Sequence, residues 1–132
     1  MNGKKVLDSY ALLAYLNKEK GYEKVKSLLG SEKALLLMND INIGEAFYVI
    51  GRSRGFEKAE YFINTILNSL PLRRVSNTFH DVLEAARIKA QHAISYADCF
   101  VVATALRERA SVITGDPEFK RVQKLVHVDW IT

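Results

Sequence analysis

The sequence predicts an α/β fold, a three-layer sandwich in which helices cover both faces of a five-stranded, mostly parallel sheet. Short apolar runs of strand length alternate along the chain with longer stretches whose apolar residues recur at helical spacing. Parallel strands need a crossover connection, usually a helix, so this alternation favours a parallel sheet between helical layers. The 132 residues contain no repeat and no low-complexity tract, which predicts a single domain over residues 1–132.

The first half of the chain is expected to hold two strands and four helices. Residues 4–7 form a short buried strand, and Ser9 caps a helix that runs to residue 16. Helical spacing predicts a second helix over residues 22–29, ended by Gly30. The unbroken apolar run at residues 35–38 predicts a strand covered on both faces.

Two helices follow, over residues 41–54 and 56–69, separated by Gly55 and stopped by Pro71. The inward stripe of the second of these helices is expected to be Ala59, Ile63, Ile66, Leu67 and Leu70.

The second half is expected to hold three strands and two helices. Residues 72–75 and 111–114 are predicted strands, and residues 126–128 form the last strand at a sheet edge. Asn77 and Ser95 are the expected caps of the two helices. Their inward residues are predicted to be Phe79, Val82, Leu83 and Ala86 in the first helix, and Phe100, Val101, Thr104 and Ala105 in the second.

Several function classes are disfavoured by composition. No apolar run approaches the ~20 residues of a membrane helix, and the N-terminal residues lack the apolar core of a signal peptide, so a cytoplasmic protein is expected. The single cysteine, Cys99, excludes an internal disulfide and a multi-cysteine zinc site. Three histidines stand far apart and in no ligand spacing, which argues against a histidine-based metal site.

Four acidic residues are expected to meet at the carboxyl edge of the sheet. Asp8 directly follows the first strand, and Asp116 comes shortly after the strand at 111–114. Glu45 and Asp98 lie near the start of the helices that follow residue 41 and Ser95. Open α/β sheets bind ligands at the carboxyl ends of their strands, which makes this edge the predicted site.

Clustered carboxylates imply a hard cation. Each acid raises the pKa of its neighbours unless a positive charge compensates. Oxygen ligands without cysteine or histidine suit Mg²⁺ or Mn²⁺, which also bind phosphate oxygens. Such an ion polarises a phosphate and lowers the pKa of an attacking water, so the pattern predicts phosphodiester hydrolysis.

Each acid also has a purely structural interpretation. Residues 42–45 and 95–98 resemble capping boxes, and Asp116 before Pro117 is typical of a turn. Asp8 is able to cap the first helix. Capping does not explain why all four acids should converge on one edge, and both interpretations stay open at this point.

Four segments of the sequence resemble the motifs of PIN-domain nucleases, in order and over nearly the whole chain. They are Val6-Leu7-Asp8-Ser9-Tyr10-Ala11-Leu12-Leu13, Asn42-Ile43-Gly44-Glu45, residues 95–105 beginning Ser95-Tyr96-Ala97-Asp98, and Ile113-Thr114-Gly115-Asp116-Pro117-Glu118-Phe119. Within that family the chain is most similar to VapC-type toxins of toxin–antitoxin pairs. The resemblance implies a five-stranded parallel sheet, Mg²⁺- or Mn²⁺-dependent cleavage of RNA such as tRNA or rRNA, inhibition by a cognate antitoxin, and a homodimer.

The same resemblance assigns roles to individual residues. Asp8 and Asp98 are the expected direct metal ligands, Asp116 a ligand directly or through water, and Glu45 the residue that orients the attacking water or completes the ion's shell. Polar neighbours expected to support them by hydrogen bonds to the carboxylates or the phosphate are Ser9, Asn42 and Thr114. Glu118, a further acid in the fourth motif, is expected to point to solvent.

Charge and aromatic residues suggest where partners bind. Without the four site acids, the remaining 11 acidic and 19 basic residues give a charge of +8, which suits a polyanionic substrate. Candidate phosphate contacts are Lys4, Lys5, Arg52, Arg54, Arg73 and Arg74. Aromatic residues gather between Phe47 and Phe62, and we expect an antitoxin helix or a second subunit to bind there.

Three other functions compete with a toxin nuclease. A PIN-domain nuclease of RNA processing has the same chemistry but no antitoxin encoded beside it. A non-catalytic module would keep only the fold, although retention of all four acids argues against it. A response-regulator-like domain would pair acids directly after its first strand, whereas the second site acid here lies within a helix.

Overall fold

A computed structural model describes residues 3–132, and its centre is a five-stranded sheet in the order β3-β2-β1-β4-β5. The strands are β1 (Lys4–Leu7), β2 (Leu35–Asn39), β3 (Leu72–Val75), β4 (Ser111–Thr114) and β5 (Val128–Trp130). Every neighbouring pair is parallel, with Val6 opposite Leu37 in β2 and Val112 in β4. Met1 and Asn2, part of the N-terminal stretch compared with a signal peptide, lie outside the described residues.

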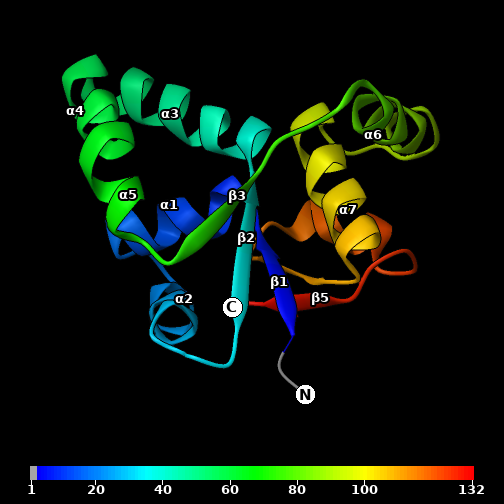
Figure 1. The fold of residues 1–132 in the computed structure, drawn as a ribbon, viewed down its shortest axis with the longest axis horizontal. Helices are drawn as coiled ribbons and strands as arrows, with labels where there is room; N and C mark the ends of the chain where they lie inside the picture. Colours follow the sequence, from blue (N-terminus) through cyan, green and yellow to red (C-terminus); the bar gives the residue numbers. More distant parts are fainter. Residues whose placement is uncertain (1–2) are drawn as a thin grey trace.

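Helices cover both faces of this sheet, which is seen nearly edge-on in Figure 1. One layer contains α1 (Ser9–Asn17), α2 (Tyr22–Leu29), α3 (Asp40–Arg54), α4 (Phe56–Tyr61), the π-helical segment η1 (Phe62–Ile66) and α5 (Leu67–Ser69). The other contains α6 (Phe79–Gln91), α7 (Tyr96–Glu108) and the 3₁₀ segment η2 (Pro117–Val122). The predicted α/β sandwich with a five-stranded parallel sheet is therefore confirmed.

Strand alternation divides the core in two. Val6, Leu37 and Val112 point to the α6–α7 side, where they pack with buried residues of α7 such as Val101. Their immediate neighbours, including Leu7 and Ile113, point to the opposite side and pack against α1 and α3. By the same alternation, a side chain one residue beyond Leu7 or Ile113 faces the α7 layer, which places Asp8 and Thr114 together there.

Three helix caps differ from the sequence prediction by one or a few residues. Asp8, not Ser9, caps α1, because its carboxylate accepts the Ala11 amide at 2.8 Å. The cap of α3 is Asn39, so residues 42–45 lie inside the helix and form no capping box. Thr78, not Asn77, caps α6 in a reciprocal capping box with Asp81. Ser95 caps α7 as predicted.

The inward face of α6 also differs in part from the prediction, although Val82 packs against the core as predicted. Phe79 and Leu83, predicted to be inward, are 77% and 39% exposed, whereas Ala85 is fully buried. The prediction for α7 holds, since Phe100, Val101, Thr104 and Ala105 are all buried.

Two further predictions differ in part from the structure. Phe62 is the fully buried residue of the π-helical segment η1, whereas Ile63 is partly buried and packs against the same core, as predicted. The last strand is Val128–Trp130 rather than residues 126–128. Val126 instead ends the preceding turn, with its amide bonded to Val122 and its side chain buried in the core.

Membrane insertion receives no support from the helices. Across residues 3–132, no helix combines the length and apolarity needed to cross a bilayer.

Candidate functional site

Asp8 is the most buried of the predicted site acids. It directly follows β1, and only 1% of its surface is exposed. Its Oδ1 accepts the Ala11 amide and its Oδ2 accepts the Thr114 hydroxyl. Burial nevertheless raises the pKa of Asp8 to about 8, and the charges of Asp98 and Asp116 add to that rise.

Thr114 sets the direction of a short hydrogen-bond chain across the strand ends. Its hydroxyl oxygen accepts the Asp116 amide at 3.0 Å, so its own hydrogen is the one donated to Asp8. This arrangement ties the residue after β1 to the loop after β4. The predicted supporting role of Thr114 toward a carboxylate matches this contact.

Asp98 occupies the first turn of α7, where the Ser95 hydroxyl accepts its backbone amide at 3.1 Å. The side chain is 7% exposed. Burial raises the pKa of Asp98 to about 6, with further contributions from the charges of Glu45, Asp116 and Glu118. Among the four predicted acids, the charges of Asp98 and Asp116 therefore act on Asp8, and those of Glu45 and Asp116 act on Asp98.

Glu45 is placed by Ser9. The Ser9 hydroxyl, in the first turn of α1, donates to Glu45 Oε1 at 2.7 Å. Glu45 lies in the second turn of α3, a helix that also packs against α7. The contact therefore links the helix after β1 to the helix after β2 at the carboxyl edge of the sheet.

Asn42 contacts no site carboxylate. Its Nδ2 donates to the Ala97 carbonyl at 3.0 Å, which ties α3 to the residue before Asp98. Its Oδ1 is buried without a hydrogen-bond partner in the described part of the chain. The second motif had suggested that Asn42 bonds a carboxylate or the phosphate. In the structure its side chain instead joins α3 to the start of α7.

Asp116 combines a structural and an electrostatic role. Its carboxylate accepts the Glu118 amide at 3.0 Å and caps η2, with Pro117 at the first helical position. Its charge also acts on both Asp8 and Asp98. Asp8 and Asp116 therefore each cap a helix and also lie close enough together for the charge of Asp116 to act on Asp8.

The donor set fits a hard divalent cation that keeps part of its water shell. No three of the acidic, histidine and cysteine side chains of residues 3–132 are drawn together tightly enough to enclose an ion. Mg²⁺ commonly uses only one or two carboxylates and retains several waters, so a closed cage is not required. The raised pKa values of Asp8 and Asp98 are those expected where a cation normally balances buried negative charge.

Glu118 also contributes to the electrostatics of the site, although it was not predicted to be a site residue. Glu118 is exposed, as expected, but its charge helps to raise the pKa of Asp98. Its position two residues after Asp116 was the available signal. Cys99 is buried and its thiol pKa is raised by burial, which is the opposite of an activated nucleophile.

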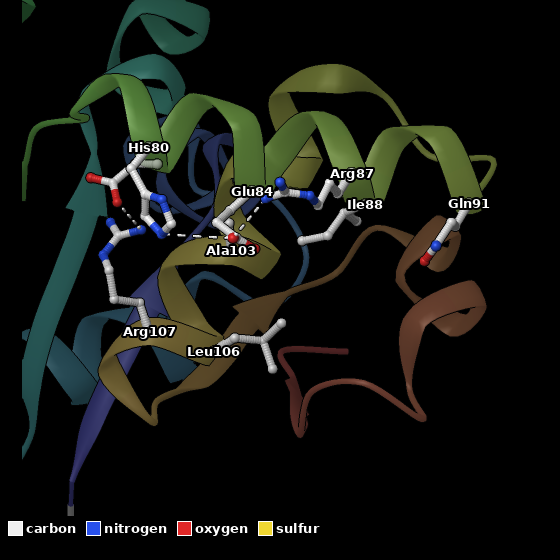
Figure 2. A pocket seen from close by; sticks show the side chains of 9 residues that line it. His80, Glu84, Arg87, Ile88, Gln91, Ala103, Leu106 and Arg107 are labelled. Atoms are coloured by element: carbon white, nitrogen blue, oxygen red, sulfur yellow. Dashed lines mark hydrogen bonds and ion pairs between the residues drawn. The ribbon is translucent and has the colours of Figure 1, made fainter.

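A separate groove between α6 and α7, of about 510 Å³, lies away from these acids. Figure 2 shows that Glu84 contacts both His80 and Arg87. Arg107 pairs with Asp81 at 3.2 Å. None of the four acids lines it. The mutual pairing leaves no unbalanced charge to select a ligand, so the acidic edge remains the candidate site.

One family model matches most of the chain. The model of the PIN domain family matches residues 5–125. A search of curated protein sequences gives no match.

Solved structures share the fold at low sequence identity. DNA-bound VapBC from Salmonella typhimurium has 17% identity and a TM-score of 0.74, with 100% of each chain covered. VapC20 from Mycobacterium tuberculosis, described as a sarcin-ricin-loop-cleaving toxin, has 17% identity and a TM-score of 0.73, covering 89% of this chain and 94% of that one. VapBC2 from Rickettsia felis, bound to promoter DNA, has 16% identity and a TM-score of 0.73, covering 96% and 98%.

Proposed function

The chain belongs to the PIN domain family, and from that premise we propose that it is a Mg²⁺- or Mn²⁺-dependent endoribonuclease that hydrolyses RNA phosphodiester bonds. The observation that carries the proposal is the electrostatic coupling of Asp8, Asp98 and their acidic neighbours at one sheet edge. Burial of these carboxyls without a compensating cation is unfavourable, and a divalent ion together with a phosphate substrate would balance them.

Asp8 and Asp98 are the residues that would hold the ion directly, with Asp116 as a ligand directly or through water. When bound, the ion would polarise the scissile phosphate and stabilise the leaving oxygen. The chain's own hydrogen bonds orient the carboxylates beforehand. Thr114 and the Ala11 amide fix Asp8, and the Ser95 hydroxyl fixes the backbone at Asp98.

Glu45 would orient the attacking water. Ser9 occupies its Oε1 at 2.7 Å, which leaves the other carboxylate oxygen to accept a hydrogen from water. Ser9 thereby acts as a positioning residue. Asn42 bonds the Ala97 carbonyl and no site carboxylate, so its role would be to align α3 with α7.

The biological role we favour is the toxin of a type II toxin–antitoxin pair, acting in the cytoplasm on an RNA such as tRNA or rRNA. Structural similarity to VapBC complexes and to a toxin that cleaves the sarcin-ricin loop supports this choice. An antitoxin would silence the enzyme by covering the acidic edge. An RNA-processing nuclease without an antitoxin is the alternative, and the neighbouring reading frame distinguishes the two.

Self-association is assigned to a different surface. Tyr48 of α3 and Phe56 and Tyr61 of α4 are exposed aromatic side chains on two helices that pack together, and we call these three residues the aromatic patch. Phe56 lies 11 residues beyond Glu45, so a second copy bound there would leave the acids open to RNA. We therefore assign this patch to a homodimer interface.

The direct test is cleavage of total cellular RNA with Mg²⁺ or Mn²⁺. Wild-type protein should cut RNA, and Asp8→Asn or Asp98→Asn should lower the rate by at least about 100-fold. Glu84→Gln is the matched control, because it removes an exposed carboxylate far from the site and should leave the rate unchanged. Undiminished cleavage by either aspartate variant would refute the assignment. Absence of stabilisation by Mn²⁺ would instead favour a non-catalytic module.

A further inference from the structure

Most of the basic residues expected to contact RNA are already paired with acids or lie at the wrong edge of the sheet. Lys4 and Arg73 both pair with Glu108, at 2.8 and 3.6 Å. Arg74 pairs with Asp40 at 2.9 Å. Lys4 also begins β1, whereas the acids follow the ends of β1 and β4. Arg52 and Arg54 lie in the last turn of α3, at the other end of that helix from Glu45, so cations nearer to the acids would guide a polyanion more effectively.

Two cationic side chains meet at the loop that leads into α7. Arg121 of η2 donates through Nη1 to the Ala93 carbonyl at 2.6 Å. Lys89, near the end of α6, donates through Nζ to the adjacent carbonyl of Ile94 at 2.8 Å. The end of α6 and the segment η2 thus place two positive charges beside Ala93 and Ile94, just before Ser95.

Hydrogen bonds connect this pair to the site acids. The carbonyls of Ala93 and Ile94 directly precede Ser95, whose hydroxyl accepts the Asp98 amide at 3.1 Å. Arg121 approaches Glu118 at 3.4 Å, and the Glu118 amide donates to the Asp116 carboxylate at 3.0 Å. The cations therefore stand beside the first turn of α7, outside the ring of carboxylates.

Both side chains keep donors available for a ligand. The Arg121 side chain is 57% exposed, and only one of its three guanidinium nitrogens is engaged. Among residues 3–132, the Lys89 ammonium donates to one acceptor although it has three hydrogens, and residue 89 is exposed. Anchoring to the loop carbonyls holds both charges in place, which lowers the entropic cost of binding an anion. Glu118 offsets the charge of Arg121 in part, through a pair in which both side chains are more than half exposed.

We propose that Lys89 and Arg121 bind the backbone phosphates of the RNA strand adjacent to the phosphate held at the acids. This inference rests on the proposed function, because it concerns how the same substrate is held. The two residues would set the path of the strand over the loop at residues 92–95, and they carry binding rather than chemistry.

Glutamine substitutions separate charge from structure. Lys89→Gln and Arg121→Gln remove the positive charge and keep a hydrogen-bond donor on the side chain. Binding is measured in an Asp98→Asn background, which prevents cleavage, by fluorescence anisotropy with a labelled single-stranded RNA over a range of salt concentrations. Each variant should weaken binding by about three- to tenfold and lower the slope of log affinity against log salt by about 0.7.

Lys33→Gln is the control, since Lys33 is exposed in the loop before β2 at the opposite edge and should leave the slope unchanged. Arg121→Lys, which keeps the charge, should restore the wild-type slope. Unchanged slopes in both glutamine variants would overturn the inference while leaving the nuclease intact. If the parent protein binds no RNA at any salt concentration, the proposed function fails, and this inference fails with it.

Discussion

At the scale of single residues, Asp8 holds a carboxyl group where a negative charge is disfavoured. Its pKa is raised to about 8, chiefly by burial. A carboxyl whose pKa is higher in the folded than in the unfolded chain stabilises the fold when protonated. That contribution is complete below a pH of about 4 and is lost progressively as the pH rises toward 8.

Asp8→Asn should therefore stabilise the metal-free protein at high pH. In EDTA at pH 8, we expect the free energy of unfolding to rise by about 1–3 kcal/mol relative to wild type, with a smaller gain at pH 5. Urea unfolding followed by circular dichroism measures the difference at each pH. A variant that is less stable than wild type at pH 8 would show that Asp8 is not under this electrostatic penalty.

Added Mn²⁺ supplies the control for the same experiment. At pH 8 it should raise the unfolding temperature of wild type, because it binds the ionised carboxylate, and it should have little effect on Asp8→Asn. An equal shift in both proteins would place the bound ion somewhere other than Asp8.

The positions of single site residues could be predicted where they depend on a short stretch of neighbouring sequence. Asp8, Asp98 and Asp116 could be placed because each stands at a fixed offset from a strand or a helix cap, and the structure brings their charges together. Their roles as ligands stay a prediction. The contact of Asn42 with Ala97 could not be foreseen, because it depends on how α3 and α7 cross rather than on either segment alone.

At the scale of elements, the caps were the least predictable feature. Asn77 and Thr78 are adjacent, and both residue types cap helices well. Thr78 caps α6, while the Asn77 side chain exchanges two hydrogen bonds with the side chain of Asn39 at 2.8 and 2.9 Å. A long-range partner of Asn77 thus separates two adjacent residues that have similar local propensity to cap a helix.

Thr78→Ala tests this cap directly. It removes the hydroxyl that accepts the Asp81 amide at 3.2 Å and should lower the free energy of unfolding by about 1 kcal/mol. Urea unfolding measures the loss, and Thr78→Ser, which keeps the hydroxyl, should recover most of it. RNA cleavage per folded molecule should be unchanged, since Thr78 contacts none of the site acids. A stability equal to wild type would mean that the capping box contributes nothing to the fold.

At the scale of the whole molecule, the fold was predictable because strand alternation and helix placement agree. Runs such as residues 35–38 are apolar on both faces, which only a sheet covered on both sides explains, and the two halves of the core confirm it. The cationic pair of Lys89 and Arg121 lay beyond sequence reasoning. Those residues are distant in the chain, and they meet only because Lys89 of α6 and Arg121 of η2 each bond a carbonyl of the same loop.

The aromatic patch of Tyr48, Phe56 and Tyr61 gives the last prediction. Phe47, partly buried beside it, packs against Phe56 with ring centroids 6.1 Å apart, and Arg52 lies over the Tyr48 ring at 5.3 Å. These contacts pre-order the patch, so little side-chain freedom is lost when a second copy covers it. Size-exclusion chromatography with light scattering should give twice the mass of one chain.

Tyr61→Asp should convert this dimer to a monomer, because a charge would be buried against an apolar partner surface. Phe79→Asp is the matched control. Phe79 is an aromatic residue on α6, more exposed than Tyr61 (77% against 59%) and outside the patch, so its variant should remain dimeric. If both variants dissociate, added charge alone weakens association. If only Phe79→Asp dissociates, the interface lies on the α6 side of the sheet. Because the acids lie apart from the patch, the monomeric Tyr61→Asp protein should still cleave RNA.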